Sequence, residues 1–262
     1  MFSSDQLKDR IRKAASELGV NDVNRVRTIV TLERIVARLV TNLFLKDHLV
    51  FGGGFVLFKE LGSSRYTKDA DAIIKGTNSV ILKAEIYDAL IKDLGDGFWF
   101  GDIETEDLQA ESGYGGIRFS ILYKVGGPFP SEEEKGRLRR IHLDISVGVD
   151  LEDVAKEAKS DSILKSLSAI EWKIYPPEFI ASEKIHCLLS RGTENSRGKD
   201  VFDLPLIFEE ISDKDLLNAI ERTFIRREFE IFSMYDTANL INTVNLKNTY
   251  NLVFGRKRRN YF

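Results

Sequence analysis

Two aspartates separated by one residue, Asp69 and Asp71, have the types and spacing of residues that do chemistry. The residues between and after them, Ala70 and Ala72–Ile74, are apolar, which predicts a strand with both carboxylates on one face. Neighbouring carboxylates repel each other unless a positive charge lies between them. That charge is usually a divalent metal ion, a lysine or an arginine. The pair therefore predicts a site that holds a cation.

A turn of glycines lies upstream of these acids. Gly52–Gly54 follows the short apolar run Leu49–Phe51, and a helix is expected to begin after it. Backbone N–H groups at such a helix start can approach a phosphate closely. The glycines could equally form a tight turn that binds nothing. Their order favours a nucleotide and metal site, because the acids begin a strand directly after the helix that the glycines open.

A later strand carries a third acid. Apolar residues alternate with polar ones over Arg139–Val149, at Ile141, Leu143, Ile145 and Val147. One face is therefore apolar, and Asp144 lies on the other. An acid in that position could simply be solvated. With Asp69 and Asp71 expected on a neighbouring strand, we interpret Asp144 as the third carboxylate of a two-metal site. His142, on the same face, is expected to be structural or to support a ligand.

A lysine and a group of charged residues follow in the last third of the chain. Pro177 favours a helix over Glu178–Arg191, on which Lys184 borders an apolar face. A lysine in that position usually extends its ammonium group to solvent. If the next segment is helical, Lys199, Asp200 and Asp203 lie within reach of one another. Without other context they would form a surface ion pair worth ~0.5 kcal/mol.

These segments together resemble the AbiEii-type toxins of the nucleotidyltransferase superfamily, which occur in bacterial abortive-infection and toxin–antitoxin systems. The four motifs of that family are matched, in order, by Gly52-Gly53 with Arg65-Tyr66-Thr67-Lys68-Asp69-Ala70-Asp71, by Leu143–Gly148, by Ala181–Arg191 and by Arg197–Leu204. Gly54 departs from the pattern, since the family usually has Thr or Ser there. Pro205 also departs from it and is expected to kink or delay its helix.

The resemblance implies an α/β fold with a nucleotidyltransferase-like mixed sheet, flanking helices and a C-terminal helical domain. We expect residues 1–150 to form the core with its N-terminal helices, and residues 151–262 to form a mainly helical domain that completes the active cleft. The resemblance also implies a role for each site residue. Asp69, Asp71 and Asp144 would hold two Mg²⁺ ions, and Gly52 and Gly53 would bind the NTP phosphates. Lys184 and Lys199 would lie beside the nucleotide, and either Asp200 or Asp203 would act as the base.

The implied reaction transfers a nucleoside monophosphate from an NTP to an acceptor hydroxyl. The resemblance further implies an RNA acceptor, with the 3′ end of tRNA as the candidate, and a cognate antitoxin encoded nearby. Two alternatives stay open. A small-molecule nucleotidyltransferase of the antibiotic-modifying kind would share the glycines and acids, and a non-enzymatic module would bind nucleotide without transferring it.

Charge is informative locally rather than over the whole chain. The formal net charge of −3 does not indicate a nucleic-acid-binding protein. Arg222, Arg226 and Arg227 could share one side of a helix, and Arg256–Arg259 form a basic tail. These clusters predict either solvated surfaces or contacts to RNA phosphates.

Composition predicts one large or two modest globular domains, because 43% of the 262 residues are hydrophobic and 30% are charged. The single cysteine, Cys187, excludes a disulfide within the chain. Neither a signal peptide at Met1–Asp5 nor an apolar run of ~20 residues is evident. We therefore expect a cytoplasmic protein. Regular elements are expected as helices over Asp5–Leu18, Val23–Phe44 and Val80–Leu94, and as strands over Phe98–Ile103, Gly116–Val125 and Ile170–Tyr175.

Overall fold

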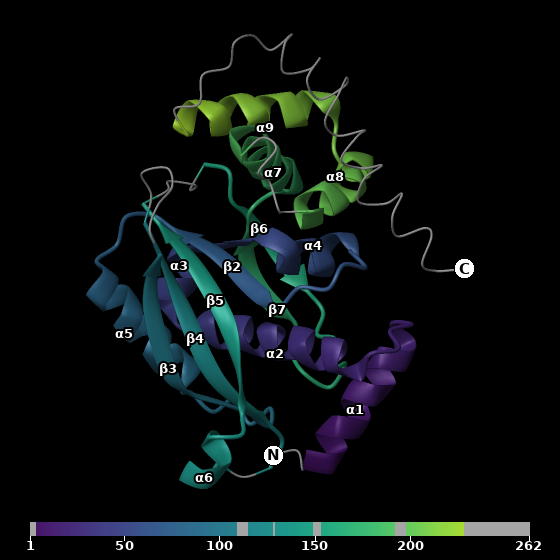
Figure 1. Ribbon diagram of the computed structural model, residues 1–262, viewed down its shortest axis with the longest axis vertical. Helices are drawn as coiled ribbons and strands as arrows, with labels where there is room; N and C mark the ends of the chain where they lie inside the picture. Colours follow the sequence, from purple (N-terminus) through teal and green to yellow (C-terminus); the bar gives the residue numbers. More distant parts are fainter. Residues whose placement is uncertain (1–3, 109–114, 128, 149–152, 192–197, 228–262) are drawn as a thin grey trace. The chain divides into compact units, whose positions relative to one another are not determined.

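The computed structural model describes residues 4–108, 115–127, 129–148, 153–191 and 198–227 (Figure 1). The chain forms two compact units, one of Met1–Glu60 with Tyr66–Tyr175 and one of Leu61–Arg65 with the chain from Pro176 onward. The first unit thus extends past residue 150, where the sequence pattern places the domain boundary. The reason is that two strands beyond that residue pair into its sheet.

The first unit is built on a mixed sheet, which confirms the predicted fold class. Seven strands among the described residues have the order β3-β4-β5-β2-β1-β7-β6. They are β1 (Leu49–Gly52), β2 (Asp69–Ile74), β3 (Phe98–Leu108), β4 (Gly116–Val125), β5 (Arg139–Val147), β6 (Lys156–Ser160) and β7 (Ile170–Ile174). β2 pairs in parallel with β5 and β1 in parallel with β7, while the other neighbours are antiparallel. The acids of β2 and β5 therefore lie on adjacent central strands.

Helices of the first unit precede, follow or connect these strands. They are α1 (Ser4–Glu17), α2 (Val23–Leu39), α3 (Leu43–His48), α4 (Gly53–Leu61), α5 (Ser79–Leu90) and α6 (Glu132–Lys135). In Figure 1, α2 crosses behind the sheet. Asp22 caps α2 by accepting a hydrogen bond from the N–H of Asn24. The predicted helix over Val23–Phe44 is instead two helices. Asn42 caps the second one, which begins at Leu43, by accepting a hydrogen bond from the N–H of Leu45.

Two short elements are not predicted by the sequence pattern. β6 (Lys156–Ser160) is an edge strand of mostly exposed residues. Its sequence therefore has no apolar face from which a strand could be predicted. α6 is a single turn held by a capping box in which Ser131 and Glu134 bond each other's backbone N–H groups. β6 is held by its antiparallel pairing with β7, and α6 by local polar contacts, so hydrophobic periodicity predicts neither.

The second unit contains α7 (Pro177–Arg191), α8 (Gly198–Glu210) and α9 (Asp213–Arg226), and α7 packs against both of the others. Pro177 occupies the first turn of α7, where its missing N–H has no helical partner to lose. α8 continues through Pro205, so the proline does not delay the helix as expected. Ser212 caps α9, which buries Ala219, Ile220, Thr223 and Phe224 on one side. The helical character predicted for this part of the chain is confirmed over these elements.

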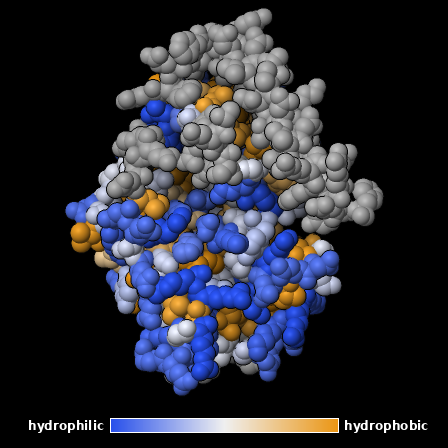
Figure 2. Space-filling model, in the orientation of Figure 1, coloured by the Kyte–Doolittle hydropathy of each residue, from blue (hydrophilic) through white to orange (hydrophobic). Residues whose placement is uncertain are grey.

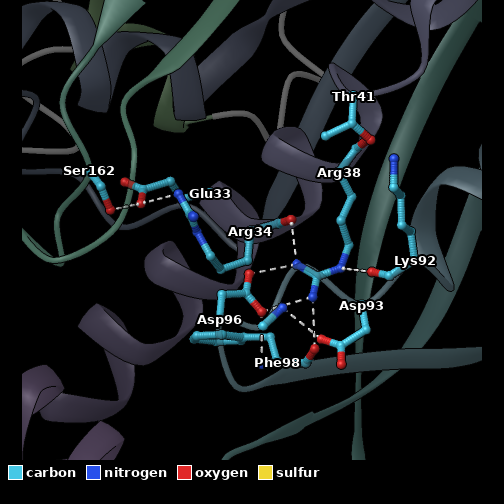
Figure 3. A network of polar contacts seen from close by, with 10 residues as sticks. Glu33, Arg34, Arg38, Thr41, Lys92, Asp93, Asp96, Phe98 and Ser162 are labelled. Carbon is cyan, nitrogen blue, oxygen red and sulfur yellow. Dashed lines mark hydrogen bonds and ion pairs between the residues drawn. The ribbon is translucent and has the colours of Figure 1, made fainter. Parts of the chain in front are cut away.

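A buried ion pair joins α2 to the turn before β3 (Figure 3). Arg38 donates to the two carboxylate oxygens of Asp96 at 2.8 and 2.9 Å and to the carbonyl of Phe98 at 2.8 Å. Its guanidinium also lies 4.7 Å from the ring centroid of Phe100. The two charged side chains are only 1% and 3% exposed. Because every charge is matched, the pair fixes the turn to the helix.

A second buried network centres on Glu33, which Figure 3 shows together with Arg34 and Ser162. Its carboxylate accepts hydrogen bonds from Arg34 at 2.8 Å, from Lys59 at 2.8 Å and from the backbone N–H of Ile163 at 3.0 Å. The hydroxyl of Ser162 donates to it as well. Lys59 lies in the last turn of α4, so the network ties the helix after the glycine turn to α2.

Hydrophilic side chains cover most of the coloured face in Figure 2, and hydrophobic ones form small scattered groups. Within the described ranges, large exposed apolar side chains are spread over several elements, as Leu43, Val80 and Ile225 illustrate. No helix in that part of the chain has both the length and the apolar character needed to cross a membrane.

The Arg38–Asp96 pair gives a stability prediction. Asp96→Ala should lower the free energy of unfolding by about 3–5 kcal/mol, because it leaves a buried guanidinium without its carboxylate. Urea denaturation measures the loss. Glu133→Ala is the control, since it removes one partner of the Glu133–Arg137 pair, whose side chains are 82% and 81% exposed. Equal effects of the two substitutions would contradict a special role for the buried pair.

Candidate active site

The glycine turn and one of the aspartates lie in direct contact. Gly53 follows β1 at the start of α4 with a φ of +67°, which an L side chain rarely adopts. A Cβ placed there would lie 1.9 Å from Oδ2 of Asp71. Gly52 is paired with Asp71 across the antiparallel β1 and β2. The turn therefore needs glycine both for its backbone angle and for the close approach of the carboxylate.

The three acids occupy neighbouring positions of one sheet face, as the sequence predicts. Along β2, half-buried and buried residues alternate, and Asp69 and Asp71 share the half-buried side. In the parallel β5, Asp144 is aligned with Asp71 and His142 with Asp69. Aligned residues of adjacent strands point to the same face. The sheet thus brings Asp69, Asp71 and Asp144 together on one face of two adjacent strands.

Arg118 on β4 is part of this face and is not identified by the sequence pattern. It is aligned with Asp144 across the antiparallel β4 and β5. Its Nε and Nη2 atoms donate to the two carboxylate oxygens of Asp144 at 2.8 and 2.7 Å. These hydrogen bonds and the negative charge of Asp144 raise the pKa of Arg118 above its usual value, so the guanidinium stays charged. The available signal in the sequence was the position of Arg118 between two apolar residues, Ile117 and Phe119, in a predicted strand.

His142 lies beside the acids and is half-buried. Its Nδ1 atom is buried and has no hydrogen-bond partner among the described residues. Its expected role as a structural or supporting group stays a prediction.

The donor atoms fit a divalent metal in chemistry, because carboxylate oxygens are the ligands that Mg²⁺ prefers. As the side chains stand, however, no group of three or more His, Cys, Asp or Glu residues in the described ranges could hold a metal ion. Both oxygens of Asp144 are bound to Arg118. A metal ion on the three carboxylates would therefore compete with Arg118 for Asp144.

In the second unit, Lys184 joins the two acids predicted near it. Its Nζ atom donates to Oδ1 of Asp200 at 2.9 Å and to Oδ2 of Asp203 at 2.8 Å. Arg65 donates from Nε to the other oxygen of Asp203 at 2.6 Å. The side chain of Asp203 is wholly buried, whereas Lys199 is exposed. The cluster is thus a buried network around Lys184, not the surface pair of Lys199 that spacing alone would allow.

The three arginines that could form either a solvated surface or contacts to RNA are engaged within their own unit. Glu183 accepts hydrogen bonds from Arg226 and from Arg227. The guanidinium of Arg222 lies 5.4 Å from the ring centroid of Phe179. Stacked and paired guanidinium groups are less available to a polyanion, since a phosphate must compete with the existing partner. The basic tail Arg256–Arg259 lies outside the described residues.

Comparison with known proteins gives consistent matches. Residues 34–257 match the family AbiEii, described as nucleotidyl transferase AbiEii toxin of a type IV toxin–antitoxin system. MenT4, the nucleotidyltransferase toxin Rv2826c of Mycobacterium tuberculosis H37Rv, has a similar fold with a TM-score of 0.54 and 16% identity, covering 80% of this chain and 68% of that one. JHP933 of Helicobacter pylori gives a TM-score of 0.48 and 16% identity, covering 84% of each chain. No curated protein matches the sequence.

The contact of Gly53 with Asp71 gives a second prediction. Gly53→Ala should destabilise the protein by clearly more than the roughly 1 kcal/mol that a strained left-handed backbone costs by itself, because the new Cβ also displaces the carboxylate. Gly19→Ala is the matched control, since Gly19 has a φ of +65° and an added Cβ would meet nothing within 4 Å. Chemical denaturation of both variants measures the difference. Equal losses would show that Asp71 does not crowd the turn.

Proposed function

Since the chain belongs to the AbiEii family of nucleotidyl transferase toxins, and is therefore a nucleotidyltransferase, we propose that it transfers a nucleoside monophosphate from an NTP to a hydroxyl of an RNA, with the 3′ end of tRNA as the candidate acceptor. Family membership argues against the non-enzymatic alternative. It also implies a cognate antitoxin of a type IV system as partner. A cytoplasmic location is part of the same proposal.

One observation carries the proposal at the level of residues: the glycine turn and three carboxylates share one sheet face. Gly53 and Asp71 are in contact, and Asp71 and Asp144 are aligned on adjacent strands. Backbone N–H groups at the start of α4 are suited to an anionic phosphate, which supports assigning the NTP phosphates to Gly52 and Gly53. The neighbouring acids are suited to the cation that accompanies such a phosphate.

Asp69, Asp71 and Asp144 would hold two Mg²⁺ ions. When bound, such ions supply charge neutralisation of the phosphate oxygens and lower the pKa of the acceptor hydroxyl. The protein's own part is to fix these carboxylates on rigid strands, so that little reorganisation is needed when the substrate arrives. The Glu33 network contributes by anchoring α4, which follows the glycine turn.

The remaining roles in this proposal are assigned from membership of the family. Lys184 and Lys199 would supply positive charge to the triphosphate. Asp203 is wholly buried and has both oxygens bound, to Lys184 and to Arg65, so we assign it to holding these two cations in place. Asp200 is then the candidate base for the acceptor hydroxyl.

Replacement of single acids tests the carboxylate face. Asp69→Asn and Asp71→Asn should each reduce transfer of labelled nucleotide by at least about 100-fold, because a neutral amide binds a metal ion poorly, while melting temperatures stay within a few degrees of the parent. Asp107→Asn is the control, since it alters an acid that is 78% exposed and pairs with Lys83. Retained transfer in either variant, or a collapse of stability in both, would remove the support for this site.

The acceptor is tested by competition. With α-labelled NTP, purified tRNA should become labelled in preference to small polyols and aminoglycosides added at equal or higher concentration. Periodate-oxidised tRNA, which lacks an intact 3′-terminal hydroxyl, is the control and should stay unlabelled. Labelling of the small molecules instead would favour the antibiotic-modifying alternative, and labelling of oxidised tRNA would exclude its 3′ end as the acceptor.

A further inference from the structure

We propose that Arg118 is an internal competitor of the divalent metal: by holding Asp144, it sets how tightly the carboxylate face binds the ion. The idea rests on the metal component of the proposed function. It assigns a role in metal affinity to a residue outside the four sequence motifs.

The contact engages both oxygens that Asp144 would offer to a metal ion. Arg118 and Asp144 are directly opposite each other on β4 and β5. Two parallel hydrogen bonds, at 2.8 and 2.7 Å, join the guanidinium to both carboxylate oxygens. A bidentate pair of this kind is stronger and more directional than a single ion contact. A metal ion that binds Asp144 therefore competes with Arg118 for the negative charge of the same two oxygens.

The positive charge of Arg118 interacts with another acid of the sheet face as well as with Asp144. The negative charge of Asp69 acts on the guanidinium in addition to that of Asp144. Asp144 in turn lies beside Asp71 in the β2–β5 register. Three acids and one arginine thus share a small area. Without the guanidinium the acids would repel one another more strongly, and a divalent ion would gain more by binding.

The exposure of the pair allows the exchange to occur. The side chain of Arg118 is 39% exposed and that of Asp144 is 21% exposed. A released guanidinium can therefore be hydrated without a large desolvation penalty, in contrast to Arg38 in the core. β4 is held in the sheet by its buried residues Ile117, Phe119 and Ile121, which lie on the opposite face. Movement of the Arg118 side chain does not disturb that packing.

The direct test is Mn²⁺ binding to the full chain in the absence of nucleotide, measured by the electron paramagnetic resonance signal of free Mn²⁺. Arg118→Gln should bind Mn²⁺ about tenfold more tightly than the parent, because the competing ion pair is gone. Arg118→Lys, which keeps the charge but cannot form the bidentate pair, should show a smaller increase. Arg137→Gln is the control for net charge, since Arg137 is 81% exposed in the turn after α6, and the affinity of this variant should equal that of the parent.

Coupling to Asp144 identifies the site of competition. In an Asp144→Asn background, Arg118→Gln should raise Mn²⁺ affinity much less than in the wild-type background, because the carboxylate that Arg118 binds directly is absent and only its weaker effect on Asp69 is left. A similar gain with and without Asp144 would overturn the proposal, as would unchanged or weaker binding by Arg118→Gln in the wild-type background. An equal gain in Arg137→Gln would also overturn it, by showing a general effect of charge.

Failure of this proposal is distinguishable from failure of the metal site. If Asp69→Asn and Asp71→Asn lose Mn²⁺ binding while Arg118→Gln leaves it unchanged, the metal site stands and Arg118 is only a structural partner of Asp144. If both aspartate variants bind Mn²⁺ like the parent, the metal site itself is wrong, and the competition proposed for Arg118 falls with it.

Discussion

The parallel pairing of β2 with β5 is the constraint on which the candidate site depends. It aligns Asp71 with Asp144 and leaves Asp69 on the same face. Side chains on a strand alternate between faces, so a shift of one residue would bury the acids of β2 and expose Ala70 and Ala72. The buried apolar residues of both strands oppose such a shift, because it would remove them from the core. The hydrophobic face of the sheet thus fixes the position of its charged face.

The glycine turn depends on a second set of contacts, which buried Glu33 on α2 makes with the end of α4. Glu33 is wholly buried on α2 and holds Lys59 at the end of α4. A buried carboxylate is stable only when charged and polar partners satisfy it, and here Arg34, Ser162 and Ile163 complete the set. α4 is therefore anchored at its C-terminal end. Its N-terminal end, at Gly53, is crowded by Asp71. Both ends of the helix are fixed before any substrate binds.

Charge compensation recurs in both units. In the first, the guanidinium of Arg118 partly neutralises the acids of the sheet face. In the second, Lys184 and Arg65 neutralise Asp203, and Lys184 also binds Asp200. Nucleotidyl transfer needs both signs of charge, since acids attract a metal and basic groups attract phosphate. Pairing these groups with each other reduces the destabilisation of the folded protein by charge repulsion and desolvation.

The sequence by itself determined the fold class, the strand that carries Asp69 and Asp71, the alternation that places Asp144 on a polar face, and the resemblance to a family. These features depend on local periodicity and on motifs, and both can be recognised from residues that are close together in the sequence. Only the tertiary structure decided that Arg118 binds Asp144, that Lys184 rather than Lys199 lies at the centre of the acidic cluster, and that Arg226 and Arg227 are paired with Glu183. Each of these contacts joins residues of different elements. Their partners depend on strand register and helix packing, which the spacing of residues within one element does not specify.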